Sequence, residues 1–227
     1  MKVSDALRAR HSVRAFTRQE VPRELLLDLL DQARRAPSGG NLQPWKLYVL
    51  AGPARERLTG AIREKIAQNA AVALTGEGAE YQIYPPDLPE PYAARRARVG
   101  IQLYESVRIG RGERAARLQQ LARNYEFFGA SVGMIVTVER CMQPGQYTDL
   151  GLFMQSLALL AVEHGLGTCM QESWANWPVT IRALLGVPET ELVFCGISLG
   201  YPDGAHPINA YRTERADFAE FGRLLET

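Results

Sequence analysis

Apolar residues recur every three or four positions near the start of the chain. Between Pro22 and Pro37, one helical face carries Leu25, Leu26, Leu29, Leu30 and Ala33. This spacing predicts an amphipathic helix. Proline suits the first position of a helix because its missing N–H group has no intrahelical partner there, whereas further along it stops the helix. We therefore expect the helix to begin near Pro22 and to end at Pro37.

Other segments predict helices of different character. A short helix opens the chain over residues 3–10, with Ser4 as its N-cap. Residues 53–74 and 179–187 also have helical patterns. The stretch 149–164 is apolar on nearly every face. We expect it to form a helix that is covered on most sides, either in the core or at a subunit interface.

Four segments have the pattern of β-strands, and they alternate with the helices. They are residues 46–52, 131–140, 168–172 and 191–202. The last of them, ELVFCGISLGYP, is continuously apolar, which is typical of a central strand. The order of elements favours an α+β or three-layer fold. A doubly wound dinucleotide fold is disfavoured because no G-x-G-x-x-G follows the first strand.

Residues 76–125 differ from the rest of the chain. The stretch YQIYPPDLPEPY is rich in proline and tyrosine, and the sequence after it becomes helical and rich in arginine. Proline clusters interrupt regular structure. We interpret this segment as an insertion or lid, outside the core, on a single domain that spans residues 1–227.

Composition and charge exclude several classes of protein. The 227 residues are 46% hydrophobic, and 26 basic side chains balance 25 acidic ones, for a net charge of +1. Neither nucleic acid nor a membrane surface is an expected partner. The N-terminus lacks the apolar stretch of a secretory signal. Cys141, Cys169 and Cys195 form no ligand motif, so we expect free thiols in a reducing cytoplasm and no metal site.

The cationic segment RARHSVR is the first candidate for chemistry. In an extended chain, alternate side chains share a face, so Arg10, Ser12 and Arg14 would set two guanidinium groups around one hydroxyl. That arrangement suits a phosphate, which accepts charge-assisted hydrogen bonds from several directions. The alternative is a solvated charged turn. Beside these cations, His11 is expected to be neutral and structural.

Two segments with small and polar residues could line a planar ligand. In PSGGNLQPW (37–45), glycine allows a close approach of the backbone, Asn41 can donate and accept hydrogen bonds, and Trp45 offers an aromatic wall. The alternative is a plain helix-to-strand connection with a core tryptophan. GLGTCMQESW (165–174) presents small and polar residues where a buried helix ends.

The C-terminal RTER contains Arg212 and Arg215 and is the last of a series of motifs along the chain. The alternative is that these two arginines belong to a solvated tail. R-x-S-x-R, APSGGNLQPW, GLGTCMQE, LGYP and RTER span nearly the whole chain. In this order they resemble the FMN-dependent nitroreductase family, and YPP…PEPY…RR with NYEFFGA resembles its nitrobenzoate-reductase-like branch. The resemblance implies a three-layer α/β/α sandwich around a mixed, mostly antiparallel sheet. It also implies an intertwined homodimer, in which the tail at about 205–227 wraps over the partner.

The resemblance assigns roles to individual residues. Arg10 and Ser12 would hold the FMN phosphate and ribityl chain, and Arg14 would lie near the N1/O2 edge, where a cation stabilises reduced flavin. Residues 37–41 would line the flavin from the partner subunit. Glu172 and Ser173 match a Glu-Gly pair whose backbone meets flavin N5, with serine in place of glycine. The implied cofactor-binding set is Arg10, His11, Ser12, Arg14, Pro37, Ser38, Gly39, Asn41, Gln171, Glu172, Ser173, Arg212 and Arg215.

The reaction implied by the resemblance is a ping-pong reduction. NADH or NADPH gives a hydride to FMN N5, and an aromatic acceptor then takes electrons at the same ring face, so no side-chain acid or base is nominated. A nitroaromatic acceptor such as a nitrobenzoate would meet Trp45, Tyr81, Tyr84, Tyr92 and Arg95, unless the lid arginines face solvent. The alternatives are reduction of a quinone or activated alkene, a dehalogenation, or flavin binding without turnover.

Overall fold

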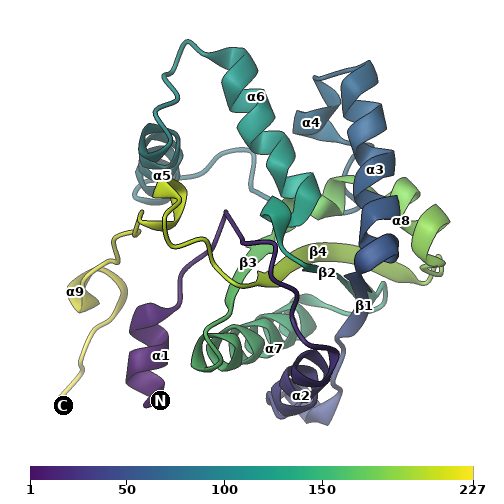
Figure 1. Ribbon diagram of the computed structural model, residues 1–227. Helices are drawn as coiled ribbons and strands as arrows, with labels where there is room; N and C mark the ends of the chain where they lie inside the picture. The colour runs from purple at the N-terminus through teal and green to yellow at the C-terminus, as the bar shows by residue number, and fades with distance from the viewer. Residues whose placement is uncertain (227) are drawn as a thin grey trace.

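The computed structural model describes residues 1–226, in which one antiparallel sheet carries helices on both faces (Figure 1). The strands are β1 (Lys46–Ala51), β2 (Val132–Glu139), β3 (Gly167–Gln171) and β4 (Glu191–Gly200). They lie in the order β1-β2-β4-β3. The central strands β2 and β4 are buried at almost every position, as their apolar sequences predict. The last residue of the predicted tail, Thr227, lies outside the described residues.

The N-terminal segment adds a parallel pairing to this sheet. Ser12 forms an isolated parallel bridge with Thr168 of β3, and the N–H group of Val13 donates to the Thr168 carbonyl at 2.9 Å. The sheet is therefore mostly antiparallel with one parallel addition. The predicted α+β class is confirmed.

The helices form the outer two layers. Those on one face are α2 (Arg23–Ala33) and α7 (Pro144–Glu163), and those on the other are α3 (Gly52–Gln68) and α8 (Pro178–Leu185). Successive side chains of a strand point to opposite faces. Accordingly, Met134 and Val136 pack toward α2 and α7, whereas Ile135 packs with Trp174 on the opposite side. Figure 1 shows α7 and α2 below the sheet and α3 and α8 above and to its right.

The remaining elements lie around this sandwich. They are α1 (Val3–Ala9), η1 (Gly39–Asn41), α4 (Val72–Thr75), α5 (Tyr92–Ser106), α6 (Arg114–Ala122), η2 (Arg123–Gly129), η3 (Glu172–Asn176), η4 (Pro207–Asn209) and α9 (Phe218–Phe221). Here η denotes a 3-10 turn. The helix α1 packs against α7, and α9 lies in the C-terminal tail on the same side of the molecule as α1 (Figure 1).

Two predicted helix starts are wrong. Helix α1 is preceded by Lys2, which makes no side-chain cap hydrogen bond, so Ser4 lies inside the helix instead of capping it. Helix α7 begins at Pro144, ahead of the predicted residue 149. The reason is a capping box, in which Gln143 and Gln146 satisfy each other's backbone N–H groups.

The helix predicted over residues 53–74 is also shorter than expected. It ends at Gln68, because Asn69 adopts an extended backbone conformation. The separate turn α4 then follows over Val72–Thr75. The helix predicted after Pro22 is present, but Pro22 is its N-cap residue and not its first helical residue. Its predicted end at Pro37 is wrong, because the helix ends at Ala33 and a turn follows.

The start of the predicted lid is anchored in the body of the protein. Glu77 accepts hydrogen bonds from Lys65 and Thr180, and the carboxylate of Glu80 pairs with Arg182 and Arg140. Tyr81 packs against the core and donates its hydroxyl to the Phe194 carbonyl at 2.7 Å. The interpretation of the whole segment 76–125 as lying outside the core is therefore wrong for residues 77–81, and also for Tyr125, which is buried in the core.

Beyond this anchor the chain forms a helical hairpin that projects away from the sheet. It consists of α5 and α6, joined at the top of the view in Figure 1. We call residues 92–123 the arm. Neither of its helices has a fully buried residue. The arm therefore fits the predicted lid, whereas residues 77–81 do not.

Glu191 is a buried carboxylate held by donors from two neighbouring strands. It is 4% exposed and accepts hydrogen bonds from Thr137 at 2.5 Å, Lys46 at 2.9 Å and Tyr48 at 3.1 Å. Burial by itself would raise the pKa of Glu191, but these donors outweigh burial and hold it below the ordinary value of 4.5. Its ionised form therefore stabilises the folded state.

We expect Glu191→Gln to lower the free energy of unfolding by about 1–3 kcal/mol at pH 7. A carboxyl whose pKa falls on folding contributes stability that is present above pH 4.5 and is lost as the pH falls through the folded-state value. The difference in the free energy of unfolding between wild type and Glu191→Gln should therefore shrink below pH 4.5. Urea unfolding at several pH values measures it. Glu189→Gln, at a side chain that is 88% exposed, is the control. A difference that does not change with pH would contradict this account.

Candidate active site

Arginines from the two ends of the chain meet beside β3. They are Arg10, Arg14, Arg212 and Arg215. The parallel bridge to Thr168 sets Ser12 among them. Burial lowers the pKa of Arg10, and the nearby charge of Arg215 lowers it further. Cations that repel each other in this way are stabilised by an anion between them.

Asn209 holds the two ends of the chain together. It is 6% exposed, and its Oδ1 accepts the backbone N–H of Arg14 at 2.8 Å. Its Nδ2 donates to the Ala15 carbonyl at 2.7 Å, while its own carbonyl accepts from Arg212 at 2.5 Å. Sequence reasoning missed this residue, because nothing in the tripeptide PIN distinguishes it from an ordinary turn.

His11 leaves an acceptor beside the arginines. Its Nδ1 lies 3.0 Å from the Ala9 carbonyl, and a carbonyl only accepts, so Nδ1 carries the proton and Nε2 has a free lone pair. Burial lowers the pKa of His11, and the charges of Arg212, Arg10 and Arg14 lower it further. The ring is therefore neutral near pH 7. Within the described residues, the buried Nε2 has no hydrogen-bond partner.

Cys169 lies beneath the arginines and was not singled out from the sequence. It is 2% exposed. Burial raises the pKa of its thiol, whereas Arg14, the adjacent Ser12 and Arg10 act in the opposite direction. Cys169 lies next to the arginines only because the N-terminal segment pairs with β3. A lone cysteine in a predicted strand gives no sign of such a pairing.

The end of β3 leads to a second group of predicted site residues. Gln171 turns inward, where its amide accepts from Ser198 and donates to the Asn124 carbonyl at 2.7 Å. Glu172 is exposed. The Oγ of Ser173 is buried, and in the part of the chain that the structure describes it has no hydrogen-bond partner. A polar group of a ligand could therefore meet Ser173 but not Gln171.

The loop with Pro37, Ser38, Gly39 and Asn41 lies elsewhere in the chain. Asp149 near the start of α7 fixes it, by accepting the Gly39 N–H at 3.2 Å. The N-terminus instead pairs with Glu163 at the far end of α7. At 1.5 Å per residue, Asp149 and Glu163 are about 20 Å apart along the helix. One chain therefore carries this loop and the arginine cluster at opposite ends of α7 (Figure 1).

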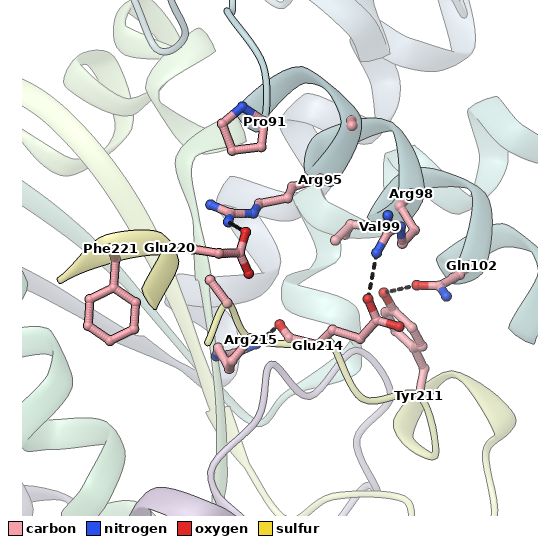
Figure 2. A pocket seen from close by; sticks show the side chains of 12 residues that line it. Pro91, Arg95, Arg98, Val99, Gln102, Tyr211, Glu214, Arg215, Glu220 and Phe221 are labelled. Atoms are coloured by element: carbon pink, nitrogen blue, oxygen red, sulfur yellow. Dashed lines mark hydrogen bonds and ion pairs between the residues drawn. The ribbon is translucent and has the colours of Figure 1, made fainter. Parts of the chain in front are cut away.

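The arm binds the C-terminal tail across a pocket of about 730 Å³. Figure 2 shows Arg95 pointing toward Glu220 and Arg98 toward Glu214, with N–O distances of 2.8 and 2.6 Å. Arg215 lines the same pocket. The predicted substrate residue Arg95 thus already has a carboxylate partner on the tail, and the arm holds the segment that carries Arg215.

The predicted aromatic residues fall into two groups. Trp45 stacks on Phe153 at 5.1 Å, and Tyr81 belongs to the anchored start of the lid, so both are packed positions. Tyr84, on the segment that leads into the arm, and Tyr92, the first residue of the arm, are both exposed. Burial raises the pKa of Tyr84, and the neighbouring carboxylate of Glu172 raises it further. Tyr84 therefore lies next to the end of β3.

A sequence profile of the nitroreductase family matches residues 7–201, from the N-terminal arginines to the end of β4. The chain belongs to this family. Its nitroreductase fold is shared with a solved structure from Sphigopyxis sp. strain HMH, the FMN- and NADPH-dependent nitroreductase NfnB. That structure has a TM-score of 0.94 and 39% identity over the whole of both chains.

Two other relatives are named after the nitro compounds that they reduce. The nitrobenzene nitroreductase of Ectopseudomonas oleovorans is 36% identical over 96% of this chain and 95% of its own length. The 4-nitrobenzoate reductase of Nocardioides sp. is 37% identical over 92% of this chain and 84% of its own. The resemblance stated from the motifs is confirmed.

Over residues 1–226, no helix is long and apolar enough to cross a membrane. Over the same residues, no group of three or more histidine, cysteine, aspartate or glutamate side chains is arranged to hold a metal ion.

Proposed function

We propose that this chain is an FMN-dependent oxidoreductase that uses NADH or NADPH to reduce nitroaromatic compounds. The observation that carries the proposal is the convergence of Arg10, Arg14, Arg212 and Arg215 around the half-buried segment that carries Ser12. Four cations in a chain with a net charge of +1 indicate a specific anionic ligand. The names of the relatives supply the substrate class.

The groups available in the site fit FMN. A phosphate dianion complements the arginines, whose planar forks match phosphate oxygens. The buried Nε2 of His11 would accept a hydrogen bond from a hydroxyl of the ribityl chain, and the buried Oγ of Ser173 would be a second polar partner. When bound, FMN supplies a centre that accepts and donates hydride.

The side chains of this protein bind and orient the reactants. Arg10 and Ser12 would hold the phosphate and ribityl groups, while Arg14 would place a positive charge beside the ring system. The lowered pKa of His11 keeps its ring neutral, so it accepts a hydrogen bond and does not donate a proton from Nε2. Glu172 and Ser173 would present their backbone to the reacting edge. The aromatic acceptor would stack near Tyr84, Tyr92 and Arg95. Tyr81 would support this region from the core, whereas Trp45, which follows the Gly39 loop, would approach the site from the partner.

We infer that two copies of the chain complete each site. The loop of Pro37, Ser38, Gly39 and Asn41 lies at the opposite end of α7 from the arginines, so it can line the flavin only from a partner. Exposed apolar residues lie near this helix, and they include Met1, Val3, Leu7 and Leu152. A second copy would cover them. With free thiols at its three cysteines, the homodimer is proposed to be cytoplasmic.

A visible spectrum of the purified protein tests the proposed function. We expect a yellow protein whose flavin absorbance is bleached by NADH or NADPH without oxygen, and is restored by nitrobenzene or 4-nitrobenzoate. A protein that takes up no FMN would contradict the cofactor. Flavin that neither donor bleaches would indicate binding without turnover. Reoxidation by a quinone but by no nitro compound would overturn the substrate class.

A further inference from the structure

The arm has a charge that the rest of the chain lacks. Residues 92–123 contain eight arginines and two glutamates, for a net charge of +6, whereas the whole chain has a net charge of +1. The remainder of the protein is therefore acidic. Such a local excess attracts anions to one part of the surface.

The arginines of the arm divide into two sets. Arg95 and Arg98 pair with carboxylates of the tail. Within residues 1–226, by contrast, no ion pair involves Arg111, Arg114 or Arg117. The guanidinium of Arg117 instead lies 3.9 Å from the ring centre of Tyr104. The second set thus keeps its charge available for a ligand.

This second set surrounds a pocket. Arg111, Arg114 and Arg117 line a cavity of about 230 Å³ between the arm and α4. The other lining residues are Leu74, Tyr104, Leu118 and Leu121. An apolar floor with a tyrosine ring suits a flat heteroaromatic group, since bases stack on such rings. Arginine forks at the rim suit a phosphate attached to that group.

A second pocket lies beside this cavity and shares Arg117 with it. It has a volume of about 590 Å³, and both Arg96 and Arg117 line it. The guanidinium of Arg96 lies 4.1 Å from the ring centre of Tyr84, and Tyr84 lies next to Glu172 at the end of β3. Alternating arginine and tyrosine side chains therefore lead from the proposed flavin edge to the far pocket on the arm.

We propose that the arm binds the phosphorylated adenosine end of the electron donor, so that Arg111 and Arg114 bind its 2′-phosphate and select NADPH over NADH. This inference rests on the proposed function, because the donor must place its nicotinamide at the flavin. The dinucleotide is long enough to need a second anchor beyond the reacting ring. The 2′-phosphate is the group by which the two donors differ, and an arginine is the usual partner for it.

The test compares Arg111→Ala, Arg114→Ala and the double variant with Arg108→Ala. Arg108 is an exposed arginine of the same hairpin that does not line the pocket. For each pocket variant we expect the KM for NADPH to rise about tenfold, with the KM for NADH and both kcat values unchanged. Calorimetry of the FMN-loaded protein with 2′,5′-ADP, 5′-AMP and inorganic phosphate gives a readout that does not depend on turnover. We expect only 2′,5′-ADP to bind well, and the double variant to lose it.

Three results with the variants and the calorimetric ligands would overturn the inference. They are an equal rise in KM for both donors, an equal effect of Arg108→Ala, and inorganic phosphate that competes as well as 2′,5′-ADP. The proposed function fails separately, because it requires only that the wild-type flavin is bleached by either donor. A wild-type enzyme that is bleached equally well by NADH and NADPH keeps its proposed function and refutes the role of the arm.

Discussion

Replacing both Arg10 and Arg215 with alanine should give a folded protein that no longer retains FMN. Each arginine would contribute charge-assisted hydrogen bonds worth about 1.5–3 kcal/mol, so we expect the dissociation constant for FMN to rise by at least about 100-fold. Titration of the flavin-free protein by the quenching of FMN fluorescence measures this change. The preparation should also be colourless where the wild type is yellow.

The stability of the flavin-free double variant distinguishes a ligand-binding role of the arginine cluster from a structural role. In the wild type, burial and the charge of Arg215 lower the pKa of Arg10, which means that the empty cluster works against folding. Without ligand, the double variant should therefore be at least as stable as the wild type in thermal unfolding. Arg8→Ala is the matched control, since Arg8 is exposed and paired with Asp5 on α1. A double variant that keeps FMN but loses stability would show that the cluster is structural.

Gly167→Ala should lower both the stability of the fold and the affinity for FMN. Gly167 opens β3 directly before Thr168, which pairs with Ser12. A methyl group at this position would lie 2.5 Å from the side chain of Val13 and 2.9 Å from that of Pro202. Overpacking of this kind costs about 1–3 kcal/mol, and each kcal/mol lowers the Tm of a chain of this size by about 2–4 °C. Because the N-terminal segment is the part that must move, the arginines it carries should move with it.

Gly60→Ala serves as the control for this substitution. Gly60 lies in α3, and nothing comes within 4 Å of a methyl group placed there. Alanine is a better helix former than glycine, so this variant should be as stable as the wild type or up to about 1 kcal/mol more stable. If Gly167→Ala were to lower the Tm without weakening FMN binding, the coupling between the strand pairing and the arginines would be disproved.

Local patterns in the sequence predicted the parts of the fold that depend on local forces. The apolar runs of β2 and β4 and the apolar helix α7 were predicted because burial is encoded in consecutive residues. The arginines of the cluster were singled out because they lie in short motifs, and the family resemblance implied that both ends of the chain serve one ligand, which stays a proposal. Asn209 could not be found in this way. Its role depends on hydrogen bonds to Arg14 and Ala15 at the other end of the chain, and an isolated asparagine has no pattern that reveals such partners.

Charged residues caused the main error in interpreting the lid. Glu77 and Glu80 lie among prolines, glycines and tyrosines, so they were included in a solvated insertion. In the fold their carboxylates meet Lys65, Arg140 and Arg182, and these partners lie on three separate elements. Burial of a charge depends on such a partner, which a sequence pattern does not supply. Asp149, the support of the Gly39 loop, was missed for the same reason.

The length of α7 has a consequence for how this protein can diverge. Asp149 holds the Gly39 loop near the start of this helix, and Glu163 meets the N-terminus at its other end. Inserting one residue between them would shift one end by about 1.5 Å and turn it by about 100°, so the two half-sites would no longer be in register. The arm is attached outside this span and can lengthen or shorten without such a penalty. Variation in chain length should therefore be tolerated where substrates are selected and not where the flavin is held.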